Sequence, residues 1–214
     1  MQAGWKQTTK TRLCHDEPVP SSNVAAAIVA GGQARRFGGQ DKSRLLIDGV
    51  PIIVRQLQVL ERIASSISII ANDADRFADL GVPVHADAVP DAGALGGLYT
   101  ALTTAGAPRV VVVGCDQPHL DAGLLARLAD LAAGEGADGA WVRTARGVEP
   151  FLACYRTASA ARLRAALDAG HRRAGDLDHL LAMAVVDEIE LARYGAPERL
   201  LANVNSPDDY ARVQ

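Results

Sequence analysis

Hydrophobic and polar positions follow one another along the chain in two kinds of block. Short runs of aliphatic residues, such as 24–29 and the sequence RVVVVG at 109–114, are typical of buried parallel strands. Other segments space their apolar residues three or four positions apart, as an amphipathic helix does. The pattern predicts strands over 24–29, 66–71, 82–85 and 109–114, and helices over 51–63, 98–104 and 121–133.

The second half of the chain is less regular but still fits the same layered domain. Residues 139–155 predict two strands joined around RTARGVEP, and a helix over 159–167 follows them. This alternation predicts an α/β fold with a single Rossmann-like, mostly parallel sheet and helices on both of its faces. We expect that domain to span 24–214, after a flexible N-terminal extension over 1–23 that contains two prolines and two serines near its end.

Polar segments follow three of the predicted strands: 31–42, 86–97 and 115–120. The carboxyl ends of parallel strands share one edge of a sheet, and ligands of such sheets bind beyond that edge. The three segments therefore predict one binding site. Asp116 follows the strongest predicted strand directly, where a carboxylate suits a Mg²⁺ ion that keeps its waters and bridges phosphates. A turn or helix-capping role is the alternative for this residue.

Composition narrows the class of partner. The 214 residues are 49% hydrophobic and 22% charged, with a formal net charge of −3 and no basic block. These values argue against nucleic acid or an anionic membrane as a partner, and no apolar run approaches the length of a membrane span. The three cysteines form no C-x-x-C pair, which predicts free thiols in a reducing cytoplasm. The histidine spacing does not suggest a zinc site.

The first polar segment has the composition of a phosphate-binding loop. Its sequence, VAGGQARRFGGQDK over 29–42, lacks the G-x-G-x-x-G pattern of dinucleotide sites and the glycine–lysine pair of a P-loop. Glycines let backbone N–H groups face an anion, and Arg36 and Lys42 add positive charge. The set as a whole predicts a phosphate site, whereas any one residue alone would fit a solvated loop.

This loop resembles the signature loop of nucleotidyltransferases that join a nucleoside monophosphate to a phosphorylated acceptor. More narrowly, the chain resembles the molybdenum cofactor guanylyltransferases over about 24–213. Three further segments carry the resemblance: HADAVPDAGALGGL at 85–98, VVVVGCDQPHL at 110–120 and LLANVNSPDDYARV at 200–213. The resemblance implies a fold of the nucleotide-diphospho-sugar transferase type.

The resemblance also implies roles for individual residues. The expected catalytic residues are Arg36, Lys42 and Asp116, with Asp116 holding Mg²⁺ as the cofactor. The expected nucleotide contacts, which include a turn at Gly96 and Gly97, are Val29, Ala30, Gly31, Gly32, Lys42, Asn72, Asp87, Gly96, Gly97 and Asp116. The expected acceptor contacts are Arg173, in the basic segment GHRRAGDL, and Asn203 and Asn205. For Asn72 an Asx turn is the alternative, and Glu149 occupies a polar position that carries histidine or glutamine in the family.

The reaction implied is transfer of GMP from GTP to the terminal phosphate of molybdopterin, or of its molybdenum-bound form, with release of pyrophosphate. The resemblance further implies a cytoplasmic enzyme with transient contacts to other molybdenum-cofactor proteins. Two alternatives stay open at this point: a cytidylyltransferase or sugar-phosphate nucleotidyltransferase of the same fold, and a non-catalytic nucleotide-binding module.

Overall fold

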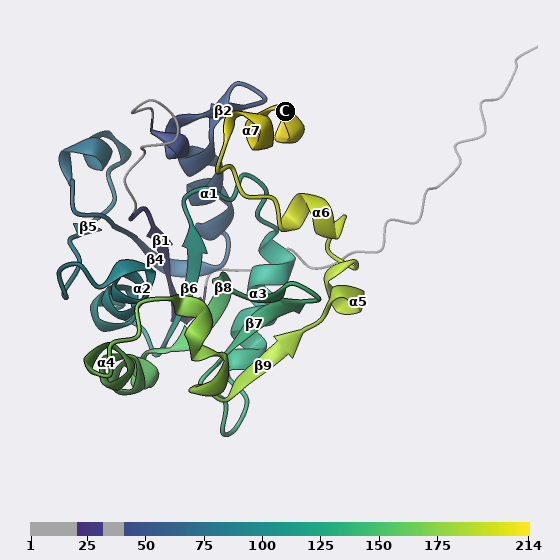
Figure 1. Ribbon diagram of the computed structural model, residues 1–214. Helices are drawn as coiled ribbons and strands as arrows, with labels where there is room; N and C mark the ends of the chain where they lie inside the picture. The colour runs from purple at the N-terminus through teal and green to yellow at the C-terminus, as the bar shows by residue number, and fades with distance from the viewer. Residues whose placement is uncertain (1–20, 32–40) are drawn as a thin grey trace, which may run out of the picture.

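Strand β1 (Ser21–Val29) lies in the parallel part of a seven-stranded sheet, between β4 (Ala64–Ile70) and β6 (Arg109–Gly114), and pairs in parallel with both. The structure is a computed structural model that describes residues 21–31 and 41–214. The strand order is β5-β4-β1-β6-β8-β7-β9 (Figure 1). β1 begins at Ser21, so the strand predicted from residue 24 starts three residues earlier than expected.

The remaining strands complete a mostly parallel sheet, as predicted. β5 (Val84–His85) pairs in parallel with β4 at one edge. β8 (Gly147–Arg156) is antiparallel to both β6 and β7 (Gly139–Thr144), which is the strand pair predicted around RTARGVEP. The opposite edge is β9 (Met183–Val186), which is parallel to β7. The sequence analysis did not predict β9, whose four residues are all apolar and show no alternation with polar ones.

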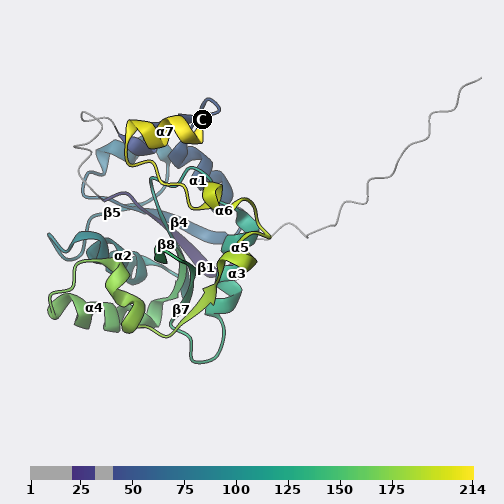
Figure 2. The same cartoon turned by 45° about the vertical axis from the view of Figure 1, so that its right-hand side comes forward.

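Helices cover both faces of the sheet (Figure 2). α1 (Ile52–Leu60) and α3 (Ala122–Ala132) pack with Ala26 and Ile28 of β1 in one core cluster. α2 (Gly93–Thr104) and α4 (Ala160–Asp168) pack on the other face, with Ala25 and Ala27 in the second core cluster. Successive residues of a strand face opposite sides, so β1 contributes to both clusters and is buried throughout its second half.

Short elements connect and cover this framework. The hairpin of β2 (Leu46–Ile47) and β3 (Val50–Pro51) follows the 3₁₀ helix η2 (Lys42–Arg44), and η3 (Asp75–Leu80) follows β4. Two further 3₁₀ helices, η4 (Thr157–Ser159) and η5 (Ala174–His179), flank α4. The chain ends in three short helices: α5 (Glu188–Leu191), α6 (Pro197–Leu200) and α7 (Pro207–Val213).

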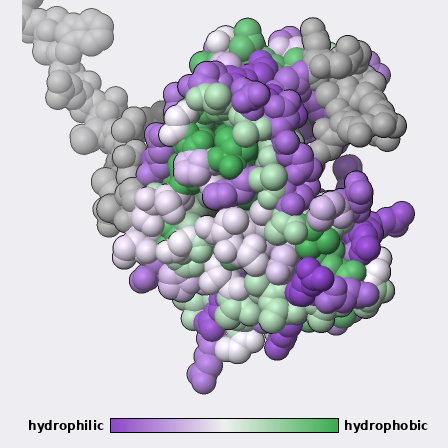
Figure 3. Space-filling view, turned by 90° about the vertical axis from the view of Figure 1, so that its left-hand side faces the viewer, coloured by the Kyte–Doolittle hydropathy of each residue, from purple (hydrophilic) through white to green (hydrophobic). Residues whose placement is uncertain are grey.

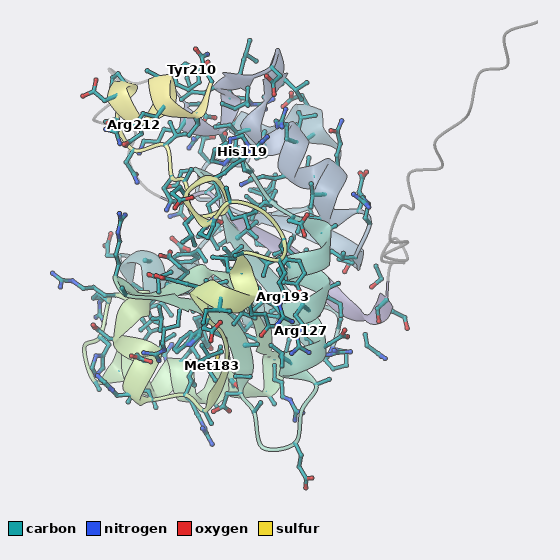
Figure 4. The ribbon with its side chains drawn as sticks, turned by 90° about the vertical axis from the view of Figure 1, so that its right-hand side faces the viewer. His119, Arg127, Met183, Arg193, Tyr210 and Arg212 are labelled. Carbon is teal, nitrogen blue, oxygen red and sulfur yellow. The ribbon has the colours of Figure 1, made fainter. Side chains whose placement is uncertain are left out.

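The C-terminal segment closes back over the hairpin. Val204 is fully buried in a small cluster with Ile47 and Ile52. The hydroxyl of Tyr210, which Figure 4 shows on α7 above His119, donates a 2.7 Å hydrogen bond to the carbonyl of Leu46. These contacts bring the segment over 204–210 against the hairpin and the start of α1.

The surface shows no large apolar area on the face in Figure 3, where hydrophobic residues form small patches between hydrophilic ones. The large exposed hydrophobic residues of the described chain are Leu46, Leu180, Val185 and Ile189. Isolated apolar residues of this kind are normal on a protein surface. Across residues 21–31 and 41–214, the helices are too short or too polar to cross a membrane.

A buried glutamine ties helix α1 to the segment that follows β6. Gln56 is 1% exposed, and its amide nitrogen donates hydrogen bonds of 2.7 Å to the carbonyl of Gly114 and 2.8 Å to that of Gln117. The Gln117 side chain accepts in turn from the backbone N–H of Gly114 at 2.9 Å. The turn that carries Asp116 is thus fixed from both sides by amide groups.

We expect Gln56→Met to lower the free energy of unfolding by about 1–3 kcal/mol, because it removes two hydrogen bonds worth about 0.5–1.5 kcal/mol each. The measurement is urea denaturation followed by circular dichroism. Gln58→Met is the matched control, since Gln58 lies on the exposed face of the same helix. It should stay within about 0.5 kcal/mol of wild type. Equal losses for the two variants would contradict the role given to Gln56.

Candidate functional site

The carboxyl ends of the parallel strands are tied together at one edge of the sheet. Beyond β1, the N–H of Ala30 donates to the carbonyl of Ile70 at 2.9 Å, and the carbonyl of Val29 accepts from Cys115 N–H at 3.1 Å. Val29 and Ala30 are buried and Gly31 is exposed, so the chain reaches the surface here. Gly32 and Arg36, two of the predicted site residues, lie outside the described residues.

Lys42 stands next to the C-terminal segment. It lies in η2, whose N-cap is Asp41; the Asp41 carboxylate accepts from the N–H of Ser43 at 3.0 Å. The ammonium group of Lys42 donates a 3.0 Å hydrogen bond to the side-chain oxygen of Asn205, which is 163 positions away in the sequence. The structure therefore brings together one residue expected to bind the nucleotide and one expected to bind the acceptor.

Asp116 belongs to the same group. Its carbonyl accepts a 2.9 Å hydrogen bond from the N–H of Val204, which draws the C-terminal segment against the end of β6. Burial raises the pKa of the Asp116 carboxyl, while a hydrogen bond from its own N–H and the positive charge of Lys42 act in the opposite direction. A side chain at position 114 would not fit here, because a Cβ on Gly114 would lie 2.8 Å from the Asp116 carboxylate.

Glu149 is a second carboxylate near Asp116, and the sequence analysis gave it no role. The pairing of β6 with β8 ends at Val113 and Leu152, and Asp116 and Glu149 both lie just beyond this last pair, close enough for the charge of one to act on the other. Burial raises the pKa of Glu149; Arg146 lowers it, and the negative charge of Asp116 raises it further. The sequence analysis named each residue separately, and only the antiparallel packing of β8 against β6 brings the two carboxylates together.

Asn72 and Asp87 meet beyond β4 and β5. The Asn72 amide donates to the Asp87 carboxylate at 2.9 Å, and the Asn72 oxygen accepts from the N–H of Asp87 at 2.8 Å. This reciprocal pair joins the two segments expected to contact the nucleoside. The Asn72 side chain thus bonds across to a neighbouring loop, whereas an Asx turn would have used its own loop.

Gly96 and Gly97 lie within α2, so the turn predicted at these residues is wrong. α2 begins at Gly93, five residues before the predicted start of that helix. A Cβ on Gly97 would lie 2.9 Å from a methyl group of Val29, and a Cβ on Gly96 would lie 2.5 Å from that of Ala92. Gly97 is therefore needed for close packing of the helix against the end of β1, and Gly96 for its packing against Ala92. The turn itself lies earlier, at Asp91 and Gly93, where φ is +54° and +63°.

The structure does not bring all the predicted acceptor residues to one place through direct contacts. Asn203 and Asn205 flank the buried Val204, beside Asp116 and Lys42. Arg173 is exposed at the start of η5, and the neighbouring Arg172 carbonyl accepts from the N–H of Leu95 in α2 at 3.2 Å. Within the described parts of the chain, the side-chain hydrogen bonds of these asparagines go to Leu201 and Lys42 and not to Arg173.

The residues around Asp116 fit a magnesium ion better than a transition metal. No group of three or more His, Cys, Asp or Glu side chains that could hold a metal is found in residues 21–31 and 41–214. Mg²⁺ does not need such a group, because it usually keeps waters and binds through one or two carboxylates and substrate phosphates. Cys115 is a poor nucleophile or ligand, since burial raises the pKa of its thiol to about 12.

Comparison with known proteins identifies the family. A family model described as "MobA-like NTP transferase domain" matches residues 26–183. A molybdenum cofactor guanylyltransferase of Burkholderia vietnamiensis is 41% identical over 168 residues, which is 71% of this chain and 79% of that protein. A probable molybdenum cofactor guanylyltransferase of Chloroflexus aggregans is 32% identical over 195 residues, or 89% and 93% of the two chains.

A solved structure shares the fold. The crystal structure of molybdopterin-guanine dinucleotide biosynthesis protein A from Archaeoglobus fulgidus superposes with a TM-score of 0.75 at 23% identity, over 88% of this chain and 96% of that one. A crystal structure described as a "putative nucleotide-diphospho-sugar transferase" from Desulfovibrio desulfuricans superposes with a TM-score of 0.54 at 21% identity, over 78% of this chain and 80% of that one. The fold type that the resemblance implied is thus confirmed.

The burial of the Asp116 carboxyl should affect the stability of the protein. Because its pKa is raised by burial, the folded protein binds a proton at Asp116 more tightly than the unfolded chain does, so the charged form costs stability at neutral pH. We expect Asp116→Asn to raise the melting temperature at pH 7 by a few degrees, within the roughly 0.5–2 kcal/mol of typical stabilising substitutions. The gain should vanish as the pH falls through the folded-state pKa. Calorimetry at several pH values measures it.

Asp121→Asn is the control, because Asp121 caps α3 through a 2.8 Å hydrogen bond from Leu124 N–H. Asparagine caps helices about as well as aspartate, so this variant should not gain stability. A melting temperature of Asp116→Asn below that of wild type at pH 7 would contradict the burial argument.

Proposed function

Because the chain belongs to the family of MobA-like NTP transferase domains, we propose that it transfers GMP from GTP to the terminal phosphate of molybdopterin, releasing pyrophosphate. The relatives named as molybdenum cofactor guanylyltransferases support this activity. The structural observation that carries it is the hydrogen bond between Lys42 and Asn205 beside Asp116. It joins the proposed nucleotide and acceptor segments at one point.

The proposed reaction balances without a base from the protein. An oxygen of the acceptor phosphate attacks the α-phosphorus of GTP, a new P–O bond forms, and the bond to the β-phosphate breaks with its electron pair leaving on pyrophosphate. The attacking phosphate is already an anion at neutral pH. The protein must hold two anions that repel each other and stabilise the charge that develops between them.

We assign the two substrates to different parts of the site. GTP binds through the segment after β1, Lys42 and the Asn72–Asp87 pair, with Arg36 as a further cation. The acceptor phosphate binds beside Asn203 and Asn205, with Arg173 as a second, more distant contact. Lys42 faces both groups, so it is positioned to contact the phosphates during transfer.

Mg²⁺ is the proposed cofactor. When bound, it supplies positive charge shared between phosphate oxygens. Asp116 is the residue that would hold it, and Glu149 adds a second carboxylate to the same pocket of negative charge. Cys115 and Cys154 are both unpaired, which agrees with the cytoplasmic location that we propose.

The proposal is tested by incubating the protein with molybdopterin and GTP, CTP or ATP in turn, with and without Mg²⁺, and measuring pyrophosphate. Release with GTP that depends on both molybdopterin and Mg²⁺ is the expected result. Preferred use of CTP, or release with a sugar phosphate in place of molybdopterin, would assign another reaction of the same fold. Nucleotide binding without any pyrophosphate would indicate a non-catalytic module.

We expect Lys42→Ala to lower kcat/KM for GTP about 10- to 150-fold, since a charge-assisted hydrogen bond is worth roughly 1.5–3 kcal/mol. Steady-state kinetics at saturating acceptor measure this change. Arg212→Ala is a suitable control, because Arg212 lies on the exposed surface of α7 and should leave GTP use unchanged (Figure 4). A drop below about threefold in a folded Lys42→Ala protein would exclude a phosphate contact.

Asn205→Ala and Arg173→Ala test the acceptor side. Each should lower the rate of transfer while the affinity for GTP stays within about twofold, because these residues are assigned to the other substrate. GTP affinity is measured by isothermal titration without acceptor. Equal losses of GTP affinity and transfer would place the C-terminal segment on the nucleotide side of the site.

A further inference from the structure

The short helix that carries Lys42 is held by an arginine from a distant part of the chain. Arg76 lies in η3 after β4, 35 positions from Asp41. Its guanidinium donates two hydrogen bonds to the Asp41 carboxylate, one of them 2.6 Å long from Nε to Oδ2. The two side chains are only 26% and 19% exposed, so solvent screens this ion pair less than a typical surface pair.

Asp41 links Arg76 to the residues on both sides of Lys42. It is the residue before Lys42, and its carboxylate also accepts from the N–H and the hydroxyl of Ser43, the residue after it, at 3.0 and 2.7 Å. Ser43 is fully buried. Burial raises the pKa of Asp41, but hydrogen bonds from Arg76 and Ser43 outweigh this effect and hold the pKa below its usual value. The carboxylate therefore stays charged and paired at neutral pH.

A second arginine completes the attachment from the opposite direction. Arg44 of η2 donates a 2.9 Å hydrogen bond to the carbonyl of Arg76 and a further one of 2.9 Å to the carboxylate of Asp79. Together Asp41, Arg44, Arg76 and Asp79 form two interlocked ion pairs, which we call the arginine clasp. η2 and η3, which these pairs join, lie near each other at the upper left of Figure 1.

The clasp is anchored in the core. The Arg76 guanidinium lies 5.0 Å from the centre of the ring of Phe77, and Phe77 is fully buried in the cluster that includes α1 and α3. Cation–π contact restricts the guanidinium further. The Arg76 side chain is therefore restrained, and its two hydrogen bonds hold the Asp41 carboxylate in place.

We propose that Arg76 is a positioning residue for Lys42: by fixing Asp41, it orients the 3₁₀ helix so that the Lys42 ammonium faces Asn205 and Asp116. This inference rests on the proposed function, in which Lys42 contacts the phosphates. The residues fixed by the clasp, Asp41 and Arg44, lie on both sides of Lys42. Arg76 also occupies the Asp41 carboxylate, which would otherwise compete with phosphates for the neighbouring ammonium group.

A double-mutant cycle tests the inference, with GTP kinetics and GTP titration as the readouts. Misplacing a phosphate-binding cation is costly to transfer, so Arg76→Ala should lower kcat/KM for GTP about 10-fold. In the Lys42→Ala background the same substitution should change it less than about twofold, because there is no ammonium group left to orient. Arg76→Lys should remain impaired, since a single ammonium cannot reproduce the two-pronged contact with Asp41. Asp41→Asn should reproduce the loss and add little to Arg76→Ala.

Arg162→Ala is the matched control. Arg162 forms an ion pair with Asp138 directly before β7, which is the strand next to the opposite edge of the sheet. Asp138 also accepts from Ser159, as Asp41 does from Ser43. This variant should keep GTP kinetics within about twofold of wild type, and melting temperatures of all variants show whether they fold.

Three results would overturn the inference. A loss in the Lys42→Ala background equal to that in wild type would make Arg76 a direct nucleotide contact. Unchanged GTP kinetics in a folded Arg76→Ala protein, with Lys42→Ala impaired, would remove the positioning role and leave the proposed function intact. Unchanged kinetics in Lys42→Ala itself would overturn both proposals.

Discussion

Parallel pairing of β1 with both β4 and β6 is the constraint on which the site depends. It brings residues 30, 71 and 115 to the same edge of the sheet, where backbone hydrogen bonds from Ala30 and Cys115 tie the strand ends together. Side chains that follow these strands then converge, although the segments are far apart in sequence. The C-terminal segment adds to this edge because Val204 bonds to Asp116 and packs into the cluster with Ile47 and Ile52.

Two partly buried carboxylates and one lysine ammonium group lie close together at this edge of the sheet. Asp116 and Glu149 are carboxylates whose pKa values are raised by burial, so keeping both of them ionised costs free energy. Lys42 offsets part of that cost for Asp116. A site for which we propose a divalent cation and two phosphorylated substrates is expected to be strained in this way when it is empty, because the charges it will bind are not yet present.

The sequence predicted the central fold well for a physical reason. Strands such as β6 are continuous aliphatic runs, and α3 begins at a recognisable N-cap aspartate, so both appear in the local pattern. The pairs that build the site do not appear there. Asn72 and Asp87 were predicted separately, and only the fold joins them. The family resemblance implied a turn at Gly96 and Gly97, whereas both lie in α2, where Gly97 permits the helix to touch Val29. Arg76 gave no signal at all, since its meaning depends on a carboxylate 35 positions away.

The hydrogen bond between Lys42 and Asn205 affects how Lys42 could exchange its contacts in the proposed reaction. Asn205 is a neutral acceptor, so its hydrogen bond to the Lys42 ammonium is charge-assisted but lacks the attraction between two opposite charges that an anionic phosphate oxygen would add. In the proposed reaction, an anionic phosphate oxygen would compete with this neutral amide oxygen for Lys42, and the amide would then be available to the acceptor. A carboxylate at position 205 would have held the ammonium group more firmly and would have repelled both substrates. The nearest carboxylate in sequence, Asp41, is already occupied by Arg76 and Ser43. In the arrangement that we propose, the ion pair between Arg76 and Asp41 would orient the segment that carries Lys42 without using the ammonium group, and a phosphate oxygen could replace the Asn205 oxygen at that group.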